Sequence, residues 1–223
     1  MKAFAIRRYN AAMEMMELPR PEPGPGELLV RVRAAGVNPL DFKIRDGGVK
    51  VLLHFSFPLI LGTDLAGDVA AIGPGVTRFK RGDAIYSRLD NDRIGAFAEY
   101  ALVRETAAAR MPARLDYAQA ASLPLVGLTA WQALIELARL QAGQKVLIHA
   151  GSGGVGTFAV QYARHLGLHV TSTTSSKNAD FVRRSAPTKS SPMTARITSS
   201  RAAVTTSSMT RSAAHSRSMP SAS

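Results

Sequence analysis

Short β-rich runs separated by turn signals fill the first half of the chain. The turn signals are clusters rich in proline and glycine, and their regular spacing between apolar runs indicates short strands. Residues 1–117 are therefore expected to form a compact all-β unit, and the spacing suggests a small barrel. The runs lie at 1–6, 28–32, 68–72 and 96–103, and the turns at 19–26, 73–75 and 81–83.

After these strands the pattern becomes helical, and then strand and helix alternate. Residues 118–138 are expected to form a helix, because apolar side chains recur on one face and include Trp131. A strand at 145–148, a helix at 153–166 and a second strand at 169–174 follow. This order is that of the opening of a doubly wound nucleotide-binding unit.

The turn between the first of these strands and its helix fits the pattern Gly-x-Gly-x-x-Gly. Glycines permit a tight turn and close backbone approach, and the N-terminus of the helix directs N–H groups and a positive dipole at a pyrophosphate. The motif predicts a dinucleotide cradle; the alternative is a tight strand-to-helix turn without a ligand. The predicted contact residues are Gly151, Ser152, Gly153, Gly154, Val155 and Gly156.

The end of the second strand indicates which dinucleotide the cradle prefers. An NAD site usually has an acidic residue about 20 positions after the first glycine, whereas an NADP site accommodates the 2′-phosphate there. This chain has Ser175, Ser176 and Lys177, with no acid before Asp180. NADPH is therefore favoured over NADH; the alternative is a polar turn that caps the next helix and leaves Lys177 in solvent.

Composition excludes several other classes. With 46% hydrophobic residues the chain can form a core, and without cysteine it forms no disulfide and no cysteine-ligated metal site. The start carries no secretory signal pattern, and Pro124, Gly127 and Glu136 interrupt the apolar stretch 118–138, which favours a buried connector over a membrane span. A cytoplasmic location without membrane contact is expected.

The net charge of +12 is concentrated near the end of the chain. Residues 1–180 carry 21 basic and 16 acidic residues, a net +5, and the remaining +7 follows Asp180. Charges of both signs alternate in the first part, without a basic stripe interleaved with aromatic residues. Nucleic-acid binding is therefore not expected.

Five segments, in this order, carry a resemblance to a known family. They are AGVNPLDFK at 35–43, FPLILGTDLAG at 57–67, IGPGVTRFKRGD at 72–83, GAFAEY at 95–100, and residues 123–184 with the glycine loop. On these segments the chain resembles the zinc-independent quinone and enone reductases, the zeta-crystallin-like branch of the medium-chain dehydrogenase/reductase superfamily. The resemblance implies an α/β fold with a GroES-like β-barrel domain at 1–117, an incomplete Rossmann domain with a parallel doubly wound sheet at 118–184, and NADPH as cofactor.

Zinc-dependent alcohol dehydrogenases share this fold, but they place cysteine and histidine ligands where this chain has Asn38, Pro39 and Thr63. The resemblance therefore implies no metal site and a hydride transfer without zinc, to a quinone ring or to the β-carbon of an α,β-unsaturated carbonyl. The histidines interpreted as surface or packing residues are His54, His149, His165 and His169.

The family pattern also implies two catalytic residues and one further cofactor contact. The amide of Asn38 is expected to donate a hydrogen bond to the developing oxyanion; the alternative is a turn residue before Pro39. Lys43 stands where close relatives often have tyrosine, and it either donates a proton or remains exposed and attracts anions. Thr129 is expected to line the cofactor, with a helix-start hydroxyl as the alternative.

The composition changes abruptly at Ser185. Residues 185–223 contain 18 serine or threonine residues and no acid, glycine, leucine or aromatic residue, so a disordered basic tail is expected. Read with a one-base shift, four-codon families permit Leu-Gly-Ala-Asp-Glu-Val-Ile after Arg184, as in a third Rossmann strand. A one-base deletion beside codon 185 is therefore predicted, and the nucleotide sequence of the gene tests it.

Three functions remain open on the sequence alone. They are an NADPH-dependent quinone or enone reductase by descent, a non-catalytic truncated protein whose barrel or tail binds a partner, and a basic nucleic-acid binder. The family completes its sheet and its catalytic domain with residues beyond this length. Weak or absent NADPH binding and low solubility are therefore expected, and the truncation puts a family-like homodimer in doubt.

Overall fold

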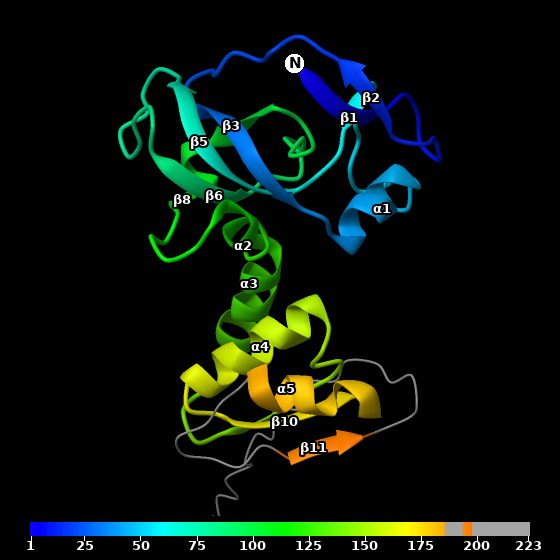
Figure 1. The fold of residues 1–223 in the computed structure, drawn as a ribbon, viewed down its shortest axis with the longest axis vertical. Helices are drawn as coiled ribbons and strands as arrows, with labels where there is room; N and C mark the ends of the chain where they lie inside the picture. Colours follow the sequence, from blue (N-terminus) through cyan, green and yellow to red (C-terminus); the bar gives the residue numbers. More distant parts are fainter. Residues whose placement is uncertain (186–193, 198–223) are drawn as a thin grey trace, which may run out of the picture. The chain divides into compact units, whose positions relative to one another are not determined.

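The chain forms two compact units, the first covering Met1–Thr129 and the second beginning at Ala130 (Figure 1). The computed structural model describes residues 1–185 and 194–197. The boundary follows Thr129, later than the predicted boundary after residue 117. The reason is that helix α2 (Tyr117–Ala121) packs against strands of the first unit, where Ala120 and Ala121 are buried against Ala66.

Two antiparallel sheets make up the first unit. The larger has the strand order β7-β3-β5-β6-β8, with β3 (Glu27–Gly36) and β5 (Asp64–Ile72) as its long central pair. The smaller has the order β2-β1-β4. The other strands are β1 (Lys2–Ile6), β2 (Glu14–Glu17), β4 (Leu59–Ile60), β6 (Ala84–Arg88), β7 (Tyr100–Arg104) and β8 (Ala108–Arg110), with a 3-10 turn at Glu105–Ala107.

The main core cluster of the first unit is formed by side chains of the larger sheet, and a smaller cluster lies where Ala66 packs against α2. Alternate side chains of β6 and β7 are buried, as expected for strands with one covered face. Full burial of an aliphatic side chain stabilises the fold by about 1.5–3 kcal/mol. The core side chains from β3, β5, β6 and β7 are Leu28, Val30, Leu65, Val69, Ile85 and Val103, each at most 1% exposed.

One helix interrupts the strands, so residues 1–117 are not all-β. Helix α1 (Pro39–Arg45) follows Asn38, whose backbone N–H donates to Asp41 Oδ2 at 2.7 Å. Proline at the first helical position and an acid in the first turn are ordinary helix-start signals. The sequence therefore contained the signals for this helix, but the prediction of strands and turns alone missed them.

The predicted helix at 118–138 is divided into three pieces. They are α2, α3 (Pro124–Trp131) and a π-helical segment, η2 (Gln132–Leu137). Proline disfavours helical backbone at the residue before it, so the break falls ahead of Pro124. Leu134 is buried at 5% exposure, but Trp131 is 45% exposed, so its expected place on a buried face is wrong. Among the described residues no helix is long and apolar enough to span a bilayer.

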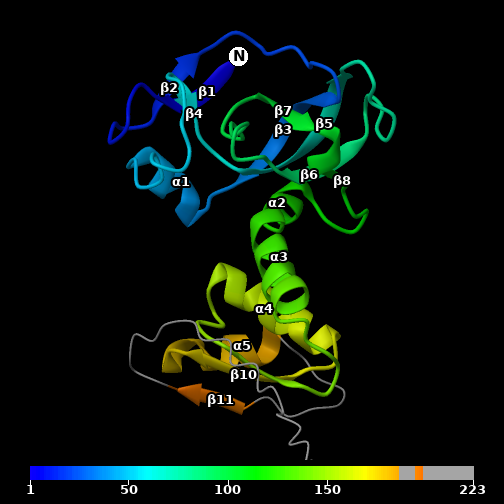
Figure 2. The same ribbon diagram turned by 180° about the vertical axis from the view of Figure 1, so that it is seen from behind.

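The second unit contains a parallel sheet of order β11-β10-β9, as expected for a Rossmann-type opening. The predicted strands and helix are confirmed as β9 (Lys145–Ile148), α4 (Gly154–His165) and β10 (His169–Thr174). Helix α4 covers one face of the sheet and buries Val160 and Ala163 against Val170 (Figures 1 and 2). A 3-10 turn, η3 (Ser176–Asn178), and α5 (Ala179–Ser185) follow.

Strand β11 (Thr194–Ile197) corrects the expectation that the whole segment 185–223 is disordered. It pairs with β10 in parallel, with Thr171 opposite Thr194 and Thr174 opposite Ile197. β-Branched residues favour strands, and β10 offers an edge on that side. The rest of the predicted disordered segment, 186–193 and 198–223, lies outside the described residues.

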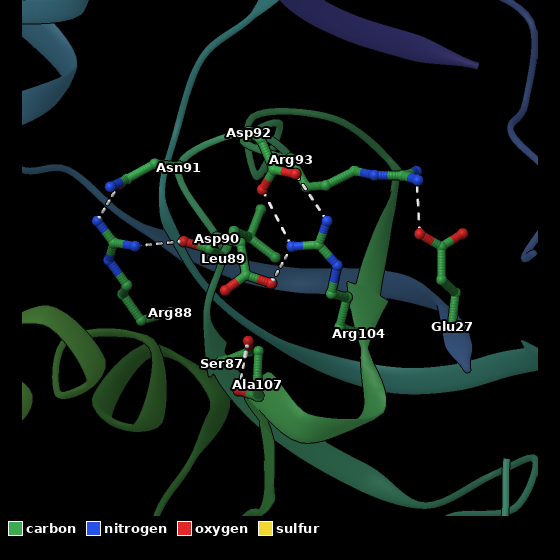
Figure 3. A network of polar contacts seen from close by, with 10 residues as sticks. All are labelled: Glu27, Ser87, Arg88, Leu89, Asp90, Asn91, Asp92, Arg93, Arg104 and Ala107. Atoms are coloured by element: carbon green, nitrogen blue, oxygen red, sulfur yellow. Dashed lines mark hydrogen bonds and ion pairs between the residues drawn. The ribbon is translucent and has the colours of Figure 1, made fainter. Parts of the chain in front are cut away.

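Ion pairs fix the loop between β6 and β7. Arg104 donates to the two carboxylate oxygens of Asp92 at 2.6 and 3.0 Å and to Asp90 at 2.8 Å (Figure 3). These carboxylates raise the pKa of Arg104 further above its ordinary value, Asp92 more than Asp90. Arg93 lies 3.0 Å from the buried Glu27. The pairing of opposite charges agrees with their alternation along this part of the sequence.

Candidate functional site

The predicted site residues fall into two groups, one in each unit. Asn38, Lys43 and Thr129 belong to the first unit, and the glycine loop and the residues after β10 belong to the second.

The glycine loop divides into buried and exposed positions. Gly151 and Gly156 are buried, whereas Gly153, Gly154 and Val155 are exposed. A Cβ on Gly156 would lie 2.2 Å from the carbonyl oxygen of Ala150, and one on Gly151 would lie 2.0 Å from Ser172 Oγ. On Gly153 the nearest atom would be the Ala150 oxygen at 3.3 Å. Gly151 and Gly156 therefore close the turn, and Gly153 and its neighbours form the open face at the start of α4.

Hydrogen bonds join the loop to the end of β10. Ser152 Oγ accepts from Thr174 Oγ1 at 2.9 Å and from Asn178 Nδ2 at 3.2 Å. The N–H of Gly151 donates to the carbonyl of Thr173 at 2.9 Å. The predicted residues Ser175, Ser176 and Lys177 are exposed and follow β10 directly. The structure therefore brings the glycine loop and these three residues together.

Sequence reasoning missed Thr174 and Asn178, which hold Ser152 in place. The sequence signal for these two residues was weak, because hydroxyl and amide side chains are common at strand ends and turns. Their function becomes visible only when their hydrogen-bond partner, Ser152, is known. Gly153 precedes α4 in extended conformation and, as a glycine, provides no side-chain cap. The N–H groups at this start are therefore not engaged by the side chain of the preceding residue.

Ala150 lies in the left-handed region, with φ of 54°. An L-residue in this conformation is less stable than glycine by about 1–2 kcal/mol. Replacement by glycine offsets part of this gain, because glycine makes the unfolded chain more flexible. Ala150→Gly is expected to stabilise the second unit by about 0.5–1 kcal/mol. Urea unfolding followed by the fluorescence of Trp131 measures the change, and a loss of stability would contradict it.

Asn38 lies in a buried polar cluster of the first unit. It is 7% exposed, and its Nδ2 donates to Asp64 Oδ2 at 3.0 Å and to Thr63 Oγ1 at 3.4 Å. Asp64 Oδ2 also accepts from the N–H of Leu125, in the first turn of α3, at 3.1 Å. The cluster thus joins the segment before α1, the start of β5 and the start of α3. Sequence reasoning found Asn38 and missed both aspartates.

Burial raises the pKa of both carboxyl groups in this cluster. Asp64 is 1% exposed, and desolvation raises its pKa to about 6 against the lowering effect of the Asn38 and Leu125 hydrogen bonds. Burial likewise raises the pKa of Asp41, whose Oδ2 accepts from the Asn38 backbone. One oxygen of each, Asp41 Oδ1 and Asp64 Oδ1, is buried without a hydrogen-bond partner. A neutral Asp64 is therefore accessible near physiological pH.

Lys43 and Thr129 occupy exposed positions. Lys43 lies in α1, two residues after Asp41, and its side chain is exposed. Thr129 lies near the end of α3, where its Oγ1 donates to the carbonyl of Leu125 at 2.7 Å. Its hydroxyl therefore satisfies a carbonyl within the helix and does not cap the helix start. No cofactor contact of Thr129 follows from the geometry within the first unit.

The described residues contain no group of three or more histidine, cysteine, aspartate or glutamate side chains arranged to hold a metal ion. At the positions where the zinc enzymes have ligands, Asn38 and Thr63 are instead hydrogen-bonded to one another.

Known proteins resemble this chain over most of its sequence. Residues 24–113 match the alcohol dehydrogenase GroES-like domain. A chloroplastic quinone-oxidoreductase homologue of Spinacia oleracea is 42% identical over 177 residues, covering 77% of this chain and 54% of that protein. An alcohol dehydrogenase superfamily protein from Novosphingobium aromaticivorans has a solved structure with 41% identity and a TM-score of 0.79, over 82% of this chain and 56% of that one.

Escherichia coli quinone oxidoreductase, solved in complex with NADPH, is 28% identical with a TM-score of 0.74, over 83% of this chain and 56% of that one. The chain spans a little over half the length of these relatives.

A GroES-like domain followed by part of a Rossmann-type unit defines the class of medium-chain dehydrogenases and reductases, which use a nicotinamide cofactor. Within this superfamily the relatives that the chain resembles are quinone oxidoreductases and their homologues.

Proposed function

We propose that the chain carries the recognition elements of an NADPH-dependent reductase that transfers hydride to a quinone or an α,β-unsaturated carbonyl without zinc. The observation that carries the proposal is the junction of the glycine loop with Ser175, Ser176 and Lys177. Hydroxyl groups and a cation suit a 2′-phosphate, and no carboxylate competes there before Asp180.

The residues present fit the cofactor. Gly153 leaves the backbone open at the start of α4, where N–H groups and the helix dipole favour a pyrophosphate. Gly151 to Gly156 would hold the pyrophosphate and Ser175 to Lys177 the 2′-phosphate. The bound nicotinamide supplies the hydride. A small-molecule substrate is implied, and the proposal includes neither nucleic acid nor a membrane among its partners.

Asn38 is the residue that would contact the substrate carbonyl, by the family pattern. Both N–H groups of its Nδ2 already donate, to Asp64 and to Thr63, so donation to a substrate carbonyl would replace one of these bonds. In the proposed reaction a hydrogen-bond donor would stabilise negative charge on the carbonyl oxygen. Lys43 is exposed, which favours the anion-attracting role over proton donation.

Lys43→Met tests these two roles. Because the side chain is exposed, we expect less than about a twofold change in turnover, since exposed single charges contribute little. A fall of tenfold or more with unchanged cofactor binding would show that Lys43 donates the proton.

Oxidation of NADPH by a quinone or an alkenal, followed at 340 nm with and without EDTA, tests the reaction itself. The expected result is slow turnover that exceeds the rate without protein, is faster with NADPH than with NADH, and is unchanged by EDTA. Loss of turnover in EDTA, or a preference for NADH, would contradict the proposal. No turnover from a chain that still binds the 2′-phosphate would favour a non-catalytic role.

A further inference from the structure

The hydroxyl of Ser152, in the glycine loop, has both of its acceptor positions occupied. Its oxygen accepts from Thr174 Oγ1 at 2.9 Å and from Asn178 Nδ2 at 3.2 Å. A hydroxyl oxygen has two lone pairs, so these bonds use its whole capacity to accept. Its O–H group donates to no atom of residues 1–185 or 194–197. Ser152 therefore offers a ligand a donor and no acceptor.

Burial decides the direction of the bond between Ser152 and Thr174. Thr174 is 6% exposed, and in the described part of the chain its hydroxyl bonds only to Ser152 Oγ. A buried O–H without an acceptor is unfavourable, so Thr174 donates and Ser152 accepts. The Nδ2 group of Asn178 can only donate. Ser152 is half-buried, so its own O–H group can face solvent.

The two partners of Ser152 stand on either side of the turn Ser175–Lys177. Thr174 precedes the turn and Asn178 follows it, and the N–H of Asn178 closes the turn by donating to Ser175 O at 3.0 Å. Because one oxygen of the loop contacts a side chain at each end of the turn, the loop and the turn lie against one another.

The turn itself offers donors without partners. The side chains of Ser175, Ser176 and Lys177 are exposed and make no hydrogen bond or ion pair with any other described residue. Together with the O–H of Ser152 they supply three hydroxyl groups and one ammonium group. Groups of this kind suit an anion whose oxygens only accept hydrogen bonds.

We propose that Ser152 donates a hydrogen bond to the 2′-phosphate of the bound dinucleotide, and that Thr174 and Asn178 are positioning residues that fix the direction of its hydroxyl. This inference rests on the proposed function and adds a residue that determines its specificity. A phosphate oxygen only accepts, whereas the 2′-hydroxyl of a ribose also carries a hydrogen to donate. With its acceptor positions occupied, Ser152 cannot accept from that hydroxyl, which favours the phosphorylated dinucleotide.

Binding of 2′,5′-ADP and 5′-AMP to the full chain and to Ser152→Ala tests the contact, with folding checked by circular dichroism. We expect the preference for 2′,5′-ADP, the ratio of the two Kd values, to fall about fivefold or more, with 5′-AMP binding unchanged. Ser152→Thr keeps the hydroxyl and should keep the preference within about twofold. A preference that survives Ser152→Ala would overturn this inference alone, whereas a wild-type chain without any preference would overturn the proposed function as well.

Asn178→Asp and Asn178→Ala separate the positioning role from the effect of charge. Both variants lose the Nδ2 donor, but only the carboxylate can accept the Ser152 O–H and turn it inward. We expect Asn178→Asp to lower the preference for 2′,5′-ADP more than Asn178→Ala does. In the Ser152→Ala background only charge repulsion remains, so the difference between the two variants should be smaller by about threefold or more. An equal difference in both backgrounds would overturn the assigned direction of the Ser152 hydroxyl.

Discussion

Gly156→Ala is expected to destabilise the second unit by at least about 3 kcal/mol, and Gly151→Ala by a similar or smaller amount. The added Cβ on Gly156 would meet backbone atoms only, the carbonyl oxygen of Ala150 at 2.2 Å and Gly151 Cα at 2.9 Å. The turn and α4 must separate to relieve this contact. On Gly151 the Cβ would displace Ser172 Oγ, which donates to the carbonyl of Ile148 at 2.9 Å between β10 and β9.

Urea unfolding measured by the fluorescence of Trp131, the single tryptophan, reports on this unit. Gly153→Ala is the matched control. Its Cβ would lie 3.3 Å from the nearest atom, so a cost below about 1 kcal/mol is expected. If Gly156→Ala unfolds at the same urea concentration as Gly153→Ala, the assignment of Gly156 to turn closure is wrong.

Asp64→Asn is expected to stabilise the first unit at pH 8 by about 3 kcal/mol and to have almost no effect below the unfolded pKa of 3.8. The folded pKa of Asp64, about 6, lies above the unfolded value, so the folded state binds the proton more tightly. The stability from this group is therefore fully present below pH 3.8 and is lost as the pH rises through 6. Asparagine does not titrate and keeps an oxygen for Leu125 and Asn38 to bond.

Urea unfolding followed by far-UV circular dichroism at several pH values between 4 and 8 measures the difference between variant and wild type. Asp46→Asn is a control for which the expected change in stability at pH 8 has the opposite sign. The hydrogen bond from Arg45 lowers the pKa of Asp46, so removing this exposed carboxylate slightly weakens the fold at pH 8 and not at low pH. A difference for Asp64→Asn that does not grow between pH 4 and pH 8 would contradict the assigned burial of its charge.

The sequence predicted the second unit closely because its signals are local. A Gly-x-Gly-x-x-Gly turn, a helix with apolar residues at three- and four-residue spacing and a β-branched strand each determine their own geometry. The buried and exposed glycines could not be separated, because the difference depends on how the turn brings the Ala150 carbonyl back to Gly156 and on Ser172 of β10.

In the first unit the sequence-based prediction was less complete. The helix α1 was marked by Asn38, Pro39 and Asp41 but lies among strands, so the all-β interpretation overrode it. Asp64 could not be found as a site residue, because its burial and its contacts with Asn38 and Leu125 join segments far apart in the chain. Its position in the sequence is that of any acid at the start of a strand.

Binding of 2′,5′-ADP and 5′-AMP to the full chain, compared by calorimetry or by ligand-detected NMR, tests the central claim most directly. The two fragments differ only in the 2′-phosphate that Ser175, Ser176 and Lys177 would hold. We expect both fragments to bind weakly, and 2′,5′-ADP to bind at least about tenfold more tightly than 5′-AMP. In Lys177→Glu this preference should be lost while binding of 5′-AMP is retained. Equal affinity for the two fragments, or a preference that survives Lys177→Glu, would contradict it.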